Sequence, residues 1–441
     1  LKVRQPARAP ASFRASPLPS APHMRVRGLL PLAFAVILSA AGSRVVQRMA
    51  HRGDGRRLKV AMFSWESLHS VSLGGIAQHV TELAAALQRR GHEIHVFTRQ
   101  GDDRQPLVEE IYGVTYHRVQ CGMDGDFVGS MAGMCNAMAW AFGETQARVG
   151  HFDLCHAHDW MTCKAMVQCK NAHSKKCVFT FHSTEPGRSQ GGGQEVVRSI
   201  EGEASFVADK IVAVSDRLKN EVMDVYSLPT SKVWPIPNGI QCHRFDGFVD
   251  TKEVKARYGI GVLDPVVLFV GRMVGGMKGA DILADAVPGI LEAHGNAKIV
   301  FVGDGDSKMH CDHVTREMGV ADSCRFVGSK SGPELTDLFK MCDCVCVPSR
   351  NEPFGLVVLE AWAAGKPVVA SDQVGCQVAH GHDGWTVSCT AAGIVWGVSQ
   401  VFKDFGKARE MGAKGRVRAA FEFSWDKVAE MTEHCYFDTL K

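Results

Sequence analysis

Residues 352–360 read Glu352-Pro-Phe-Gly-Leu-Val-Val-Leu-Glu360, and this stretch says most about the fold. It places two carboxylates eight positions apart around a predicted helix start. The segment Leu356 to Ala364 carries one charge, Glu360, among apolar residues, which is typical of a buried helix. A lone carboxylate on such a helix is costly unless it is hydrogen-bonded or binds something.

The residues before this helix predict an anion site. Pro353 suits a first helical turn, where its missing N–H costs nothing. The free N–H groups of Phe354, Gly355 and Leu356 would then point outward toward an anion. Two carboxylates beside such a site suit a sugar phosphate. The alternative is a capped core helix whose Glu360 meets a distant arginine.

Strands and helices alternate from residue 58 onward, which predicts an α/β fold of parallel sheets. A helix over 76–90, ended by Gly91, follows the first strand. The predicted strands of a first cycle are 58–63, 93–98, 154–157, 177–182, 211–215 and 233–236. Those of a second cycle are 266–270, 298–302, 325–327, 344–347 and 367–370. Two doubly wound, Rossmann-like domains facing a cleft are therefore expected.

The expected domains follow from these cycles. A first Rossmann-like domain spans 54–245, and a second spans 246–405. Helices over 406–441 are expected to pack back toward the first domain. The polar segment 241–255, which has no clear period, is predicted to be a linker.

Residues 1–53 differ in composition from the rest of the chain. They contain nine Lys or Arg and no Asp or Glu, which leaves 41 basic and 47 acidic residues in the remainder. A basic start at Met24 leads into an apolar run and then small residues, the pattern of a targeting signal. Only 16 residues separate Arg27 from Arg44, which is short for a membrane span. This segment is predicted to be targeting or disordered sequence.

The remaining composition bounds the class of protein. No basic stripe marks the acidic remainder for nucleic acid, so no nucleic-acid partner is expected. The 15 cysteines are thinly spread, and Cys342, Cys344 and Cys346 alternate as small hydrophobes of one predicted strand. Cysteine usage therefore favours a reducing compartment, the cytoplasm or a plastid. The signal-like segment points the other way, because it is typical of proteins that enter the secretory route.

Candidate site residues recur where predicted strands end, which is where such sheets bind ligands. Gly74-Gly75 precedes a helix start and suits the close approach of a phosphate, although a double glycine is often only a turn. Arg272 and Lys278 lie on a glycine-rich loop that opens another helix. They could neutralise a diphosphate without a metal ion. The alternative is a solvated basic loop.

Further polar residues follow other strands. His182 is placed to act within a cleft, and Asp159 and Asn238 occupy equivalent positions. His156 and His158 share a strand face but lack a third ligand, so metal binding is not expected. The sequences Asp304-Gly-Asp306 and Asp124-Gly-Asp126 invite a Mg²⁺ interpretation. Arg272 and Lys278 make that interpretation unnecessary.

Residues 58 to about 440 resemble the retaining GT-B glycosyltransferases of family 4, a group that includes glycogen synthases and sucrose-phosphate synthases. The matching segments follow one another in the family's order over most of the chain. They are Met62–Glu66, Gly74–Val80, Phe152–Trp160, Thr180–Glu185, Ile236–Ile240, Val270–Met273 with Lys278-Gly279, Phe301–Gly305 and Glu352–Glu360.

The resemblance implies a role for each matching residue. Arg272 and Lys278 would bind the donor diphosphate, and Glu352 would lie near the transferred sugar. Glu360 would hold the ribose hydroxyls, and His182 would contact the donor sugar at the reacting centre. The backbone amides of Phe354, Gly355 and Leu356 would contact sugar or phosphate, and Gly74 and Gly75 would approach the phosphates from the opposite domain. Asn238 and Asp159 would be a donor-binding residue and a further candidate.

The resemblance also implies the chemistry. A hexosyl group, glucosyl in the first instance, would pass from UDP- or ADP-glucose to a carbohydrate acceptor such as an α-glucan, with retention and with no metal or other cofactor. The domain 54–245 would then be the acceptor-side domain, and the domain 246–405 would bind the nucleotide sugar. The alternatives are a sucrose-type synthase, a lipid or glycoconjugate glycosyltransferase, or a catalytically inactive module that binds nucleotide sugar or glycan. One departure stands out: the family usually places the Arg and Lys five apart, whereas Arg272 and Lys278 are six apart.

Overall fold

The computed structural model describes residues 56–122, 125–274 and 276–441. Residues 57–441 form one compact unit. The predicted targeting segment 1–53 lies outside the described residues. Asp124 of the first Asp-Gly-Asp sequence and Gly275 of the basic loop lie outside them as well. Among the described residues, no helix combines the length and the hydropathy needed to cross a membrane.

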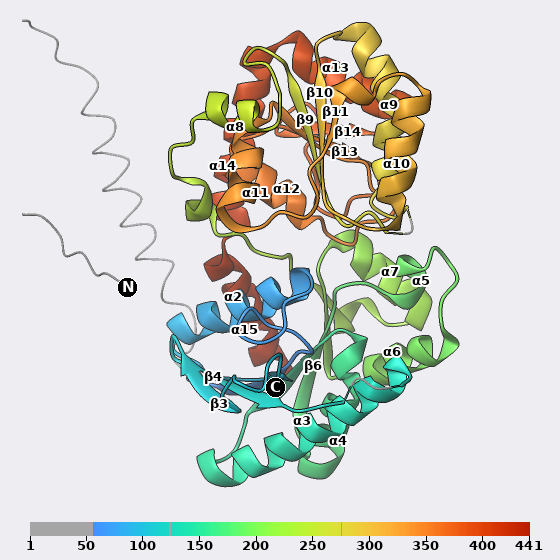
Figure 1. The fold of residues 1–441 in the computed structure, drawn as a ribbon. Coiled ribbons are helices and arrows are strands. Elements are labelled where there is room, and N and C mark those ends of the chain that lie inside the picture. Colours follow the sequence, from blue (N-terminus) through green and yellow to red (C-terminus); the bar gives the residue numbers. More distant parts are fainter. Residues whose placement is uncertain (1–55, 123–124, 275) are drawn as a thin grey trace, which may run out of the picture. The chain divides into compact units, whose positions relative to one another are not determined.

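Eight strands form the first sheet, in the order β3-β4-β2-β1-β5-β6-β7-β8 (Figure 1). All neighbouring strands are parallel except β3 and β4, which form an antiparallel pair at one edge. The strands are β1 (Lys59–Phe63), β2 (Glu93–Arg99), β3 (Val108–Ile111), β4 (Val114–Val119), β5 (Leu154–His158), β6 (Lys176–Phe181), β7 (Lys210–Ala213) and β8 (Val233–Pro235).

Six strands form the second sheet, in the order β11-β10-β9-β12-β13-β14, and every neighbouring pair is parallel. The strands are β9 (Val266–Val270), β10 (Lys298–Val302), β11 (Cys324–Phe326), β12 (Cys344–Val347), β13 (Val368–Ser371) and β14 (Gly384–Val387). In both sheets the strand order reverses beside the first strand of the cycle, which is where doubly wound folds place their ligands.

Helices connect the strands and cover the sheets. Those that accompany the first sheet are α2 (Gly75–Arg89), α3 (Phe127–Val149), α4 (Cys163–His173), α5 (Glu185–Arg188), α6 (Glu195–Val207) and α7 (Asp216–Tyr226). The later helices are α8 (Thr251–Arg257), α9 (Ala280–Ala293), α10 (Asp306–Glu317), α11 (Gly332–Met341), α12 (Leu356–Ala363), α13 (Ala391–Lys403), α14 (Phe405–Glu422) and α15 (Trp425–Thr439).

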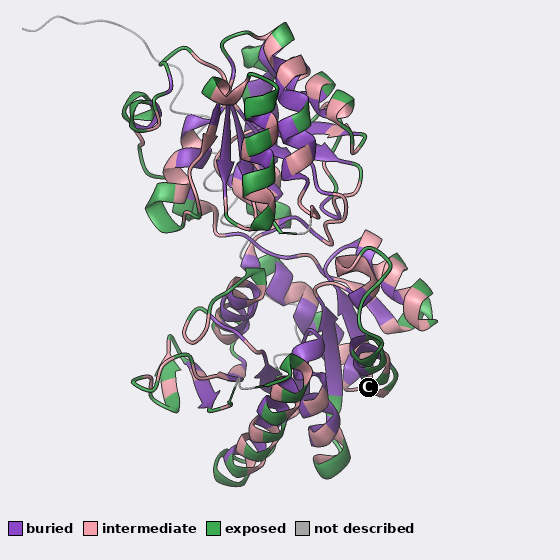
Figure 2. Ribbon diagram, turned by 45° about the vertical axis from the view of Figure 1, so that its right-hand side comes forward, coloured by how far each residue is buried: buried purple, intermediate pink, exposed green. Residues whose placement is uncertain are grey.

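The strands at the centre of each sheet are buried on both faces (Figure 2). This burial explains why β1 and β9 are almost wholly apolar, since strands covered by helices on both sides have no solvent face. The fifteen cysteines are free thiols, and most are buried. Cys344 and Cys346 lie in β12 as predicted, whereas Cys342 lies just beyond the end of α11, outside the strand.

Two details differ from the sequence prediction. The predicted linker 241–255 is partly helical: a 3₁₀ turn spans Cys242–Phe245, and α8 begins within the segment. The Asp250 carboxylate caps α8 by accepting from the N–H groups of Lys252 and Glu253, a local signal that a search for periodicity misses. The short strands β3, β4 and β14 were also missed, because they lack a long apolar run.

The two C-terminal helices pack in different places. Helix α14 packs on α12 and α13 beside the second sheet, whereas α15 packs on α2 and β6 of the first. The buried hydroxyl of Tyr436 on α15 lies 2.6 Å from Nδ1 of His156 on β5, which ties this helix to the first sheet. The chain therefore crosses back to the first sheet between Glu422 and Trp425.

Candidate active site

A cavity of about 810 Å³ is lined by loops that follow the carboxyl ends of strands in both sheets. The loops after β1, β5, β6, β7 and β8 contribute from the first sheet, and those after β9 and β12 contribute from the second. All the predicted site residues line this cavity except Glu360. They are Gly74, Gly75, Asp159, His182, Asn238, Arg272, Lys278, Glu352, Phe354, Gly355 and Leu356. Sequence segments that are far apart thus converge on one site.

Lys278 and Glu352 form an ion pair on the cavity wall. The Lys278 Nζ lies 2.5 Å from Oε2 of Glu352, and both side chains are partly buried. Burial strengthens such a charge-assisted bond relative to a surface pair. Arg272, on the same loop, is exposed and makes no ion pair among the described residues. Lys278 is therefore anchored by an ion pair, whereas Arg272 beside it is exposed.

A second arginine supports the loop that carries Lys278. Arg350 Nη1 donates to the carbonyl of Gly276 at 2.6 Å, and its guanidinium pairs with Asp281 of α9 at 2.5 and 2.8 Å. The Arg350 N–H also donates to the carbonyl of Met277. These bonds fix the loop despite the additional residue between Arg272 and Lys278. Sequence reasoning assigned no role to Arg350.

Helix α12 begins at the cavity with Leu356, the first residue of the predicted helical segment. Gly355, with φ of 105°, is the residue before the helix, and Leu356 is the first helical residue. Pro353 therefore lies outside the first turn, which corrects the sequence interpretation. Its carbonyl instead accepts a hydrogen bond of 2.5 Å from Ser215 Oγ, so the proline belongs to the turn that connects to the first sheet.

The carboxylate of Glu360 on α12 is not paired with another side chain among the described residues. It does not line the cavity, and among the described residues its carboxylate has no hydrogen bond or ion pair. Burial raises its pKa to about 7, against a weaker opposing attraction from Arg244. The distant arginine of the alternative interpretation thus exists, although it makes no salt bridge. Glu360 is thus a half-buried carboxylate without a partner among the described residues.

We expect Glu360→Gln to weaken donor nucleotide binding by about 1–3 kcal/mol, because the ribose hydroxyls would lose their acceptor. The same change should stabilise the free protein at pH 8. The folded state binds the Glu360 proton more tightly than the unfolded state, so stability falls as pH rises from about 4.5 through about 7. Because the side chain keeps partial solvent exposure, we expect a gain of about 1 kcal/mol.

Calorimetric titration with nucleotide and thermal melts at pH 5 and pH 8 check both parts. Glu317→Gln, at an exposed position of α10, is the matched control. Unchanged affinity together with an unchanged difference in melting temperature between the two pH values would show that Glu360 has neither role.

The start of α2 carries its own carboxylate. Oε2 of buried Glu66 accepts from the N–H groups of Leu73 and Gly74 at 2.7 and 3.0 Å. The Gly74 amide is therefore engaged by a protein carboxylate. A Cβ at Gly75 would lie 2.7 Å from Cδ1 of Leu356, so glycine allows the starts of α2 and α12 to meet. Sequence reasoning quoted Glu66 within a motif but gave it no role.

His182 follows β6 and lies in a cluster of imidazoles. Its Nε2 is 3.4 Å from Nδ1 of His158, and its ring centroid is 4.6 Å from that of His79. Burial lowers the pKa of all three rings, to about 4 for His79, so they are neutral at pH 7. Asn238 was expected at the donor. Its side-chain oxygen lies 2.7 Å from Nδ1 of His79.

This cluster corrects one sequence argument. Metal binding was set aside because His156 and His158 lacked a third ligand. The structure places His79 and His182 beside His158, with one ring nitrogen of each within 4.8 Å of the others. His156 is instead satisfied by Tyr436 and by Thr180. The third ring was missed because His79 lies on α2, far away in the sequence.

Asp159 is held in a strained conformation at the end of β5. It has φ of 62°, and its Oδ1 accepts from the N–H of Trp160 at 2.9 Å. Burial raises its pKa to about 6, opposed by the guanidinium of Arg188 at 3.7 Å. Positive φ at a residue other than glycine is uncommon and clusters at functional sites. Asp159 also lines the cavity.

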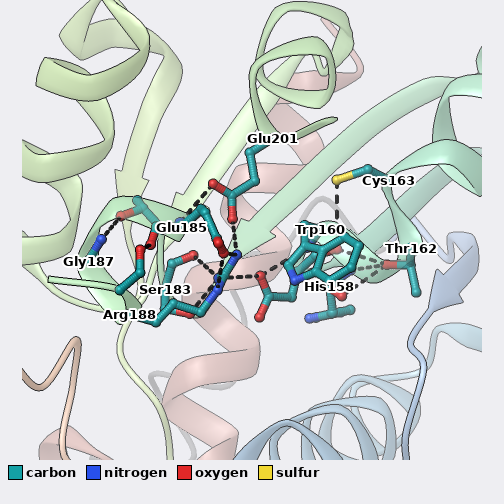
Figure 3. A network of polar contacts seen from close by, with 12 residues as sticks. His158, Trp160, Thr162, Cys163, Ser183, Glu185, Gly187, Arg188 and Glu201 are labelled. Atoms are coloured by element: carbon teal, nitrogen blue, oxygen red, sulfur yellow. Dashed lines mark hydrogen bonds and ion pairs between the residues drawn. The ribbon is translucent and has the colours of Figure 1, made fainter. Parts of the chain in front are cut away.

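Arg188 is shared among three carboxylates (Figure 3). It pairs with Glu201 at 2.6 Å and Glu185 at 2.9 Å, in addition to Asp159. Glu201 is buried and also accepts from the hydroxyl of Tyr226. The network fixes the loop after β6, because Glu185 Oε1 accepts from the N–H of Gln194. No sequence pattern singled out this arginine.

Comparison with known proteins agrees with this geometry. The family model described as Glycosyltransferase Family 4 matches residues 73–244, and that described as Glycosyl transferases group 1 matches residues 250–418. An uncharacterised glycosyltransferase of Methanocaldococcus jannaschii is 35% identical over 389 residues, covering 86% of this chain and 98% of that protein.

Solved structures share the fold. Sucrose-phosphate synthase from Thermosynechococcus elongatus superposes with a TM-score of 0.74 at 24% identity, covering 87% of this chain and 99% of that chain. Anabaena HepE in complex with UDP and glucose superposes with a TM-score of 0.71 at 18% identity, covering 87% and 100%. The two parallel sheets are thus those of the predicted GT-B fold, and the chain belongs to the family 4 type of glycosyltransferases.

Proposed function

We propose that this glycosyltransferase moves a hexosyl group, glucosyl in the first instance, from a nucleoside diphosphate sugar to an uncharged carbohydrate acceptor, with retention of anomeric configuration. The observation that carries the proposal is the Lys278–Glu352 pair at the start of α12, with Arg272 beside it, in one cavity. A cation for the diphosphate and a carboxylate for the sugar then lie side by side.

The donor class rests on charge. Lys278, Arg272 and the positive end of α12 can together hold a diphosphate without a metal ion. Relatives of the same fold support a nucleotide donor, since HepE was solved with UDP-glucose and starch synthase IV of Arabidopsis thaliana with ADP and acarbose. UDP-glucose and ADP-glucose are accordingly the first donors to test.

The acceptor class rests on the opposite wall of the cavity. Arg188 is the third cation of the described lining, and its guanidinium is already shared among three carboxylates. Glu66 and Asp159 add negative charge to the lining, and the indoles of Trp65 and Trp160 add apolar surface. This wall suits a neutral sugar and disfavours a phosphorylated acceptor. A glycogen synthase of Mycobacterium tuberculosis, 28% identical over 402 residues, supports an α-glucan.

In the proposed reaction, the bond from the anomeric carbon to the donor phosphate oxygen breaks while the acceptor hydroxyl attacks from the same face. The acceptor proton passes to the leaving phosphate, so no protein nucleophile is required. Arg272 and Lys278 stabilise the charge that develops on the diphosphate. His182 and Glu352 hold the sugar, and the amides of Phe354, Gly355 and Leu356 orient it at the start of α12.

An acceptor panel and the stereochemistry of the product test this proposal. Glycogen and maltooligosaccharides should accept the glucosyl group, and proton NMR of the fresh product should show an α-linkage from an α-linked donor. Some relatives, such as one in Kineococcus radiotolerans, are D-inositol 3-phosphate glycosyltransferases. A clear preference for an inositol phosphate or a lipid over every neutral glycan would reject the acceptor assignment, and a β-linked product would reject retention.

Chelation should leave activity intact, because the proposed cations are Arg272, Lys278 and the helix start. Initial rates with and without excess EDTA, after desalting, check this expectation. A complete loss that Mg²⁺ or Mn²⁺ restores would transfer the role of diphosphate binding to a metal. Asp304 and Asp306 would then be the first candidate ligands.

A further inference from the structure

Three imidazoles from three separate elements meet at the back of the cavity. His79 comes from α2, His158 from the end of β5, and His182 from the residue after β6. One ring nitrogen of each lies within 4.8 Å of the others, and the His79 and His158 centroids are 5.3 Å apart. His182 lines the cavity, so an ion has a path to the cluster.

Two nitrogens of the cluster lack partners. Nδ1 of His79 donates to the side-chain oxygen of Asn238, which leaves Nε2 with a free lone pair. Among the described residues, Nε2 of His79 and Nε2 of His158 are buried with no hydrogen bond. A buried polar atom without a partner is unfavourable, because it has lost its hydrogen bonds to water. Two of them in one cluster indicate a ligand that is not a protein group.

The three imidazole nitrogens indicate which kind of ion could bind to the cluster: a metal ion that prefers nitrogen ligands. Neutral imidazoles ligate Zn²⁺ and its neighbours in the first transition row, whereas Mg²⁺ and Ca²⁺ prefer oxygen. Metal–nitrogen bonds of about 2.0–2.1 Å require the rings to close in slightly from their present spacing. Asn238 would act as the outer partner that fixes the tautomer of a ligating histidine.

We propose that His79, His158 and His182 bind a transition-metal dication of the Zn²⁺ type, and that the bound ion inhibits sugar transfer by occupying His182. Three protein ligands leave a fourth position for water on the cavity side. The inhibitory part rests on the proposed function, in which His182 must be free to contact the donor sugar. The ion is thus an inhibitor and no cofactor, so chelation should not reduce the activity.

Cobalt titration tests the site without an activity assay. Full-length protein is stripped with EDTA, desalted and titrated with Co²⁺, which gives an intense visible band in a tetrahedral nitrogen site. We expect one Co²⁺ per chain, displaced by Zn²⁺ and unaffected by excess Mg²⁺. His79→Gln and His158→Gln should weaken binding by about 10-fold or more, and Asn238→Ala by about 10–100-fold. Asn238→Ala keeps all three rings and serves if a ligand variant fails to fold.

The control is His313→Gln, since His313 pairs with Glu317 on the exposed face of α10 and could bind zinc at the surface. It should leave the cobalt band unchanged. Absence of a band, or a band that persists in His79→Gln, His158→Gln and Asn238→Ala, would overturn the site.

The activity arm then tests inhibition. Zn²⁺ should raise the KM for the donor, and EDTA should reverse the effect. One ion bound at the cluster with unchanged kinetics would overturn the inhibitory part. A protein inactive with every donor would instead refute the proposed function, and the cobalt titration would still decide the site.

Discussion

Lys278→Ala should reduce the turnover of sugar transfer by about 10²–10³-fold, the usual effect of removing one group that stabilises transition-state charge. Lys278 is the one cation of the described cavity lining that is anchored by an ion pair to Glu352. Its ammonium would face the leaving diphosphate as the glycosidic bond breaks. Because this charge develops mainly in the transition state, kcat should fall more than the donor KM rises.

Steady-state kinetics with varied donor measures this change. Lys330→Ala is the matched control, because it removes a lysine that pairs with Glu334 of α11, and neither residue belongs to the described cavity lining. Lys278→Arg should recover part of the rate, since the guanidinium restores the positive charge but has a different geometry from the ammonium. Equal kinetics for Lys278→Ala and Lys330→Ala would show that the leaving group is stabilised elsewhere.

Glu352→Gln should lower kcat by about 10²-fold while the donor KM changes little, because its proposed partner is the reacting sugar. The amide keeps the shape of the side chain but removes the charge that pairs with Lys278. Part of the loss in kcat should therefore arise because the Lys278 ammonium is no longer held in place by Glu352. The double variant with Lys278→Ala should lose less than the product of the two single effects, as coupled residues do.

The same assay decides this prediction, with Glu334→Gln as the exposed control. A rise in KM at constant kcat would assign Glu352 to ground-state binding alone. Fully multiplicative losses in the double variant would show that the ion pair has no functional part.

Much of this architecture could be predicted from the sequence, because buried parallel strands read as apolar runs. β1 and β9 are such runs, and each leads to a cavity residue at its carboxyl end. The edge strands β3 and β14 were missed: each has only four residues, and neither is a continuous apolar run. Element boundaries were mostly right within a residue or two.

Site residues could be predicted where they belong to a short sequence motif. They could not be predicted where their role depends on contacts with residues far away in the sequence. Arg272, Lys278 and Glu352 stand out by spacing. Arg350 and Arg188 do not, because their importance comes from carboxylates on other elements. Pro353 was wrongly placed in the first turn of α12 for a similar reason: its carbonyl accepts a hydrogen bond from Ser215, a residue far away in the sequence.

The histidine cluster shows the same limit. His158 could be recognised at a strand end, whereas His79 lies inside α2 with no local sign of function. Only the packing of α2 against the first sheet brings its ring to His182. Sequence patterns show the periodicity along one helix or strand. They do not show which side chains of three separate elements meet in space.

Release of nucleotide from a panel of donor sugars, with and without glycogen, tests the central claim most directly. The purified full-length protein should release UDP or ADP from the matching glucosyl donor in a glycogen-dependent manner, and Lys278→Ala should suppress the release. Nucleotide sugar that binds in calorimetry but is never turned over, whatever the donor or acceptor, would contradict the claim. The cavity would then belong to a binding module.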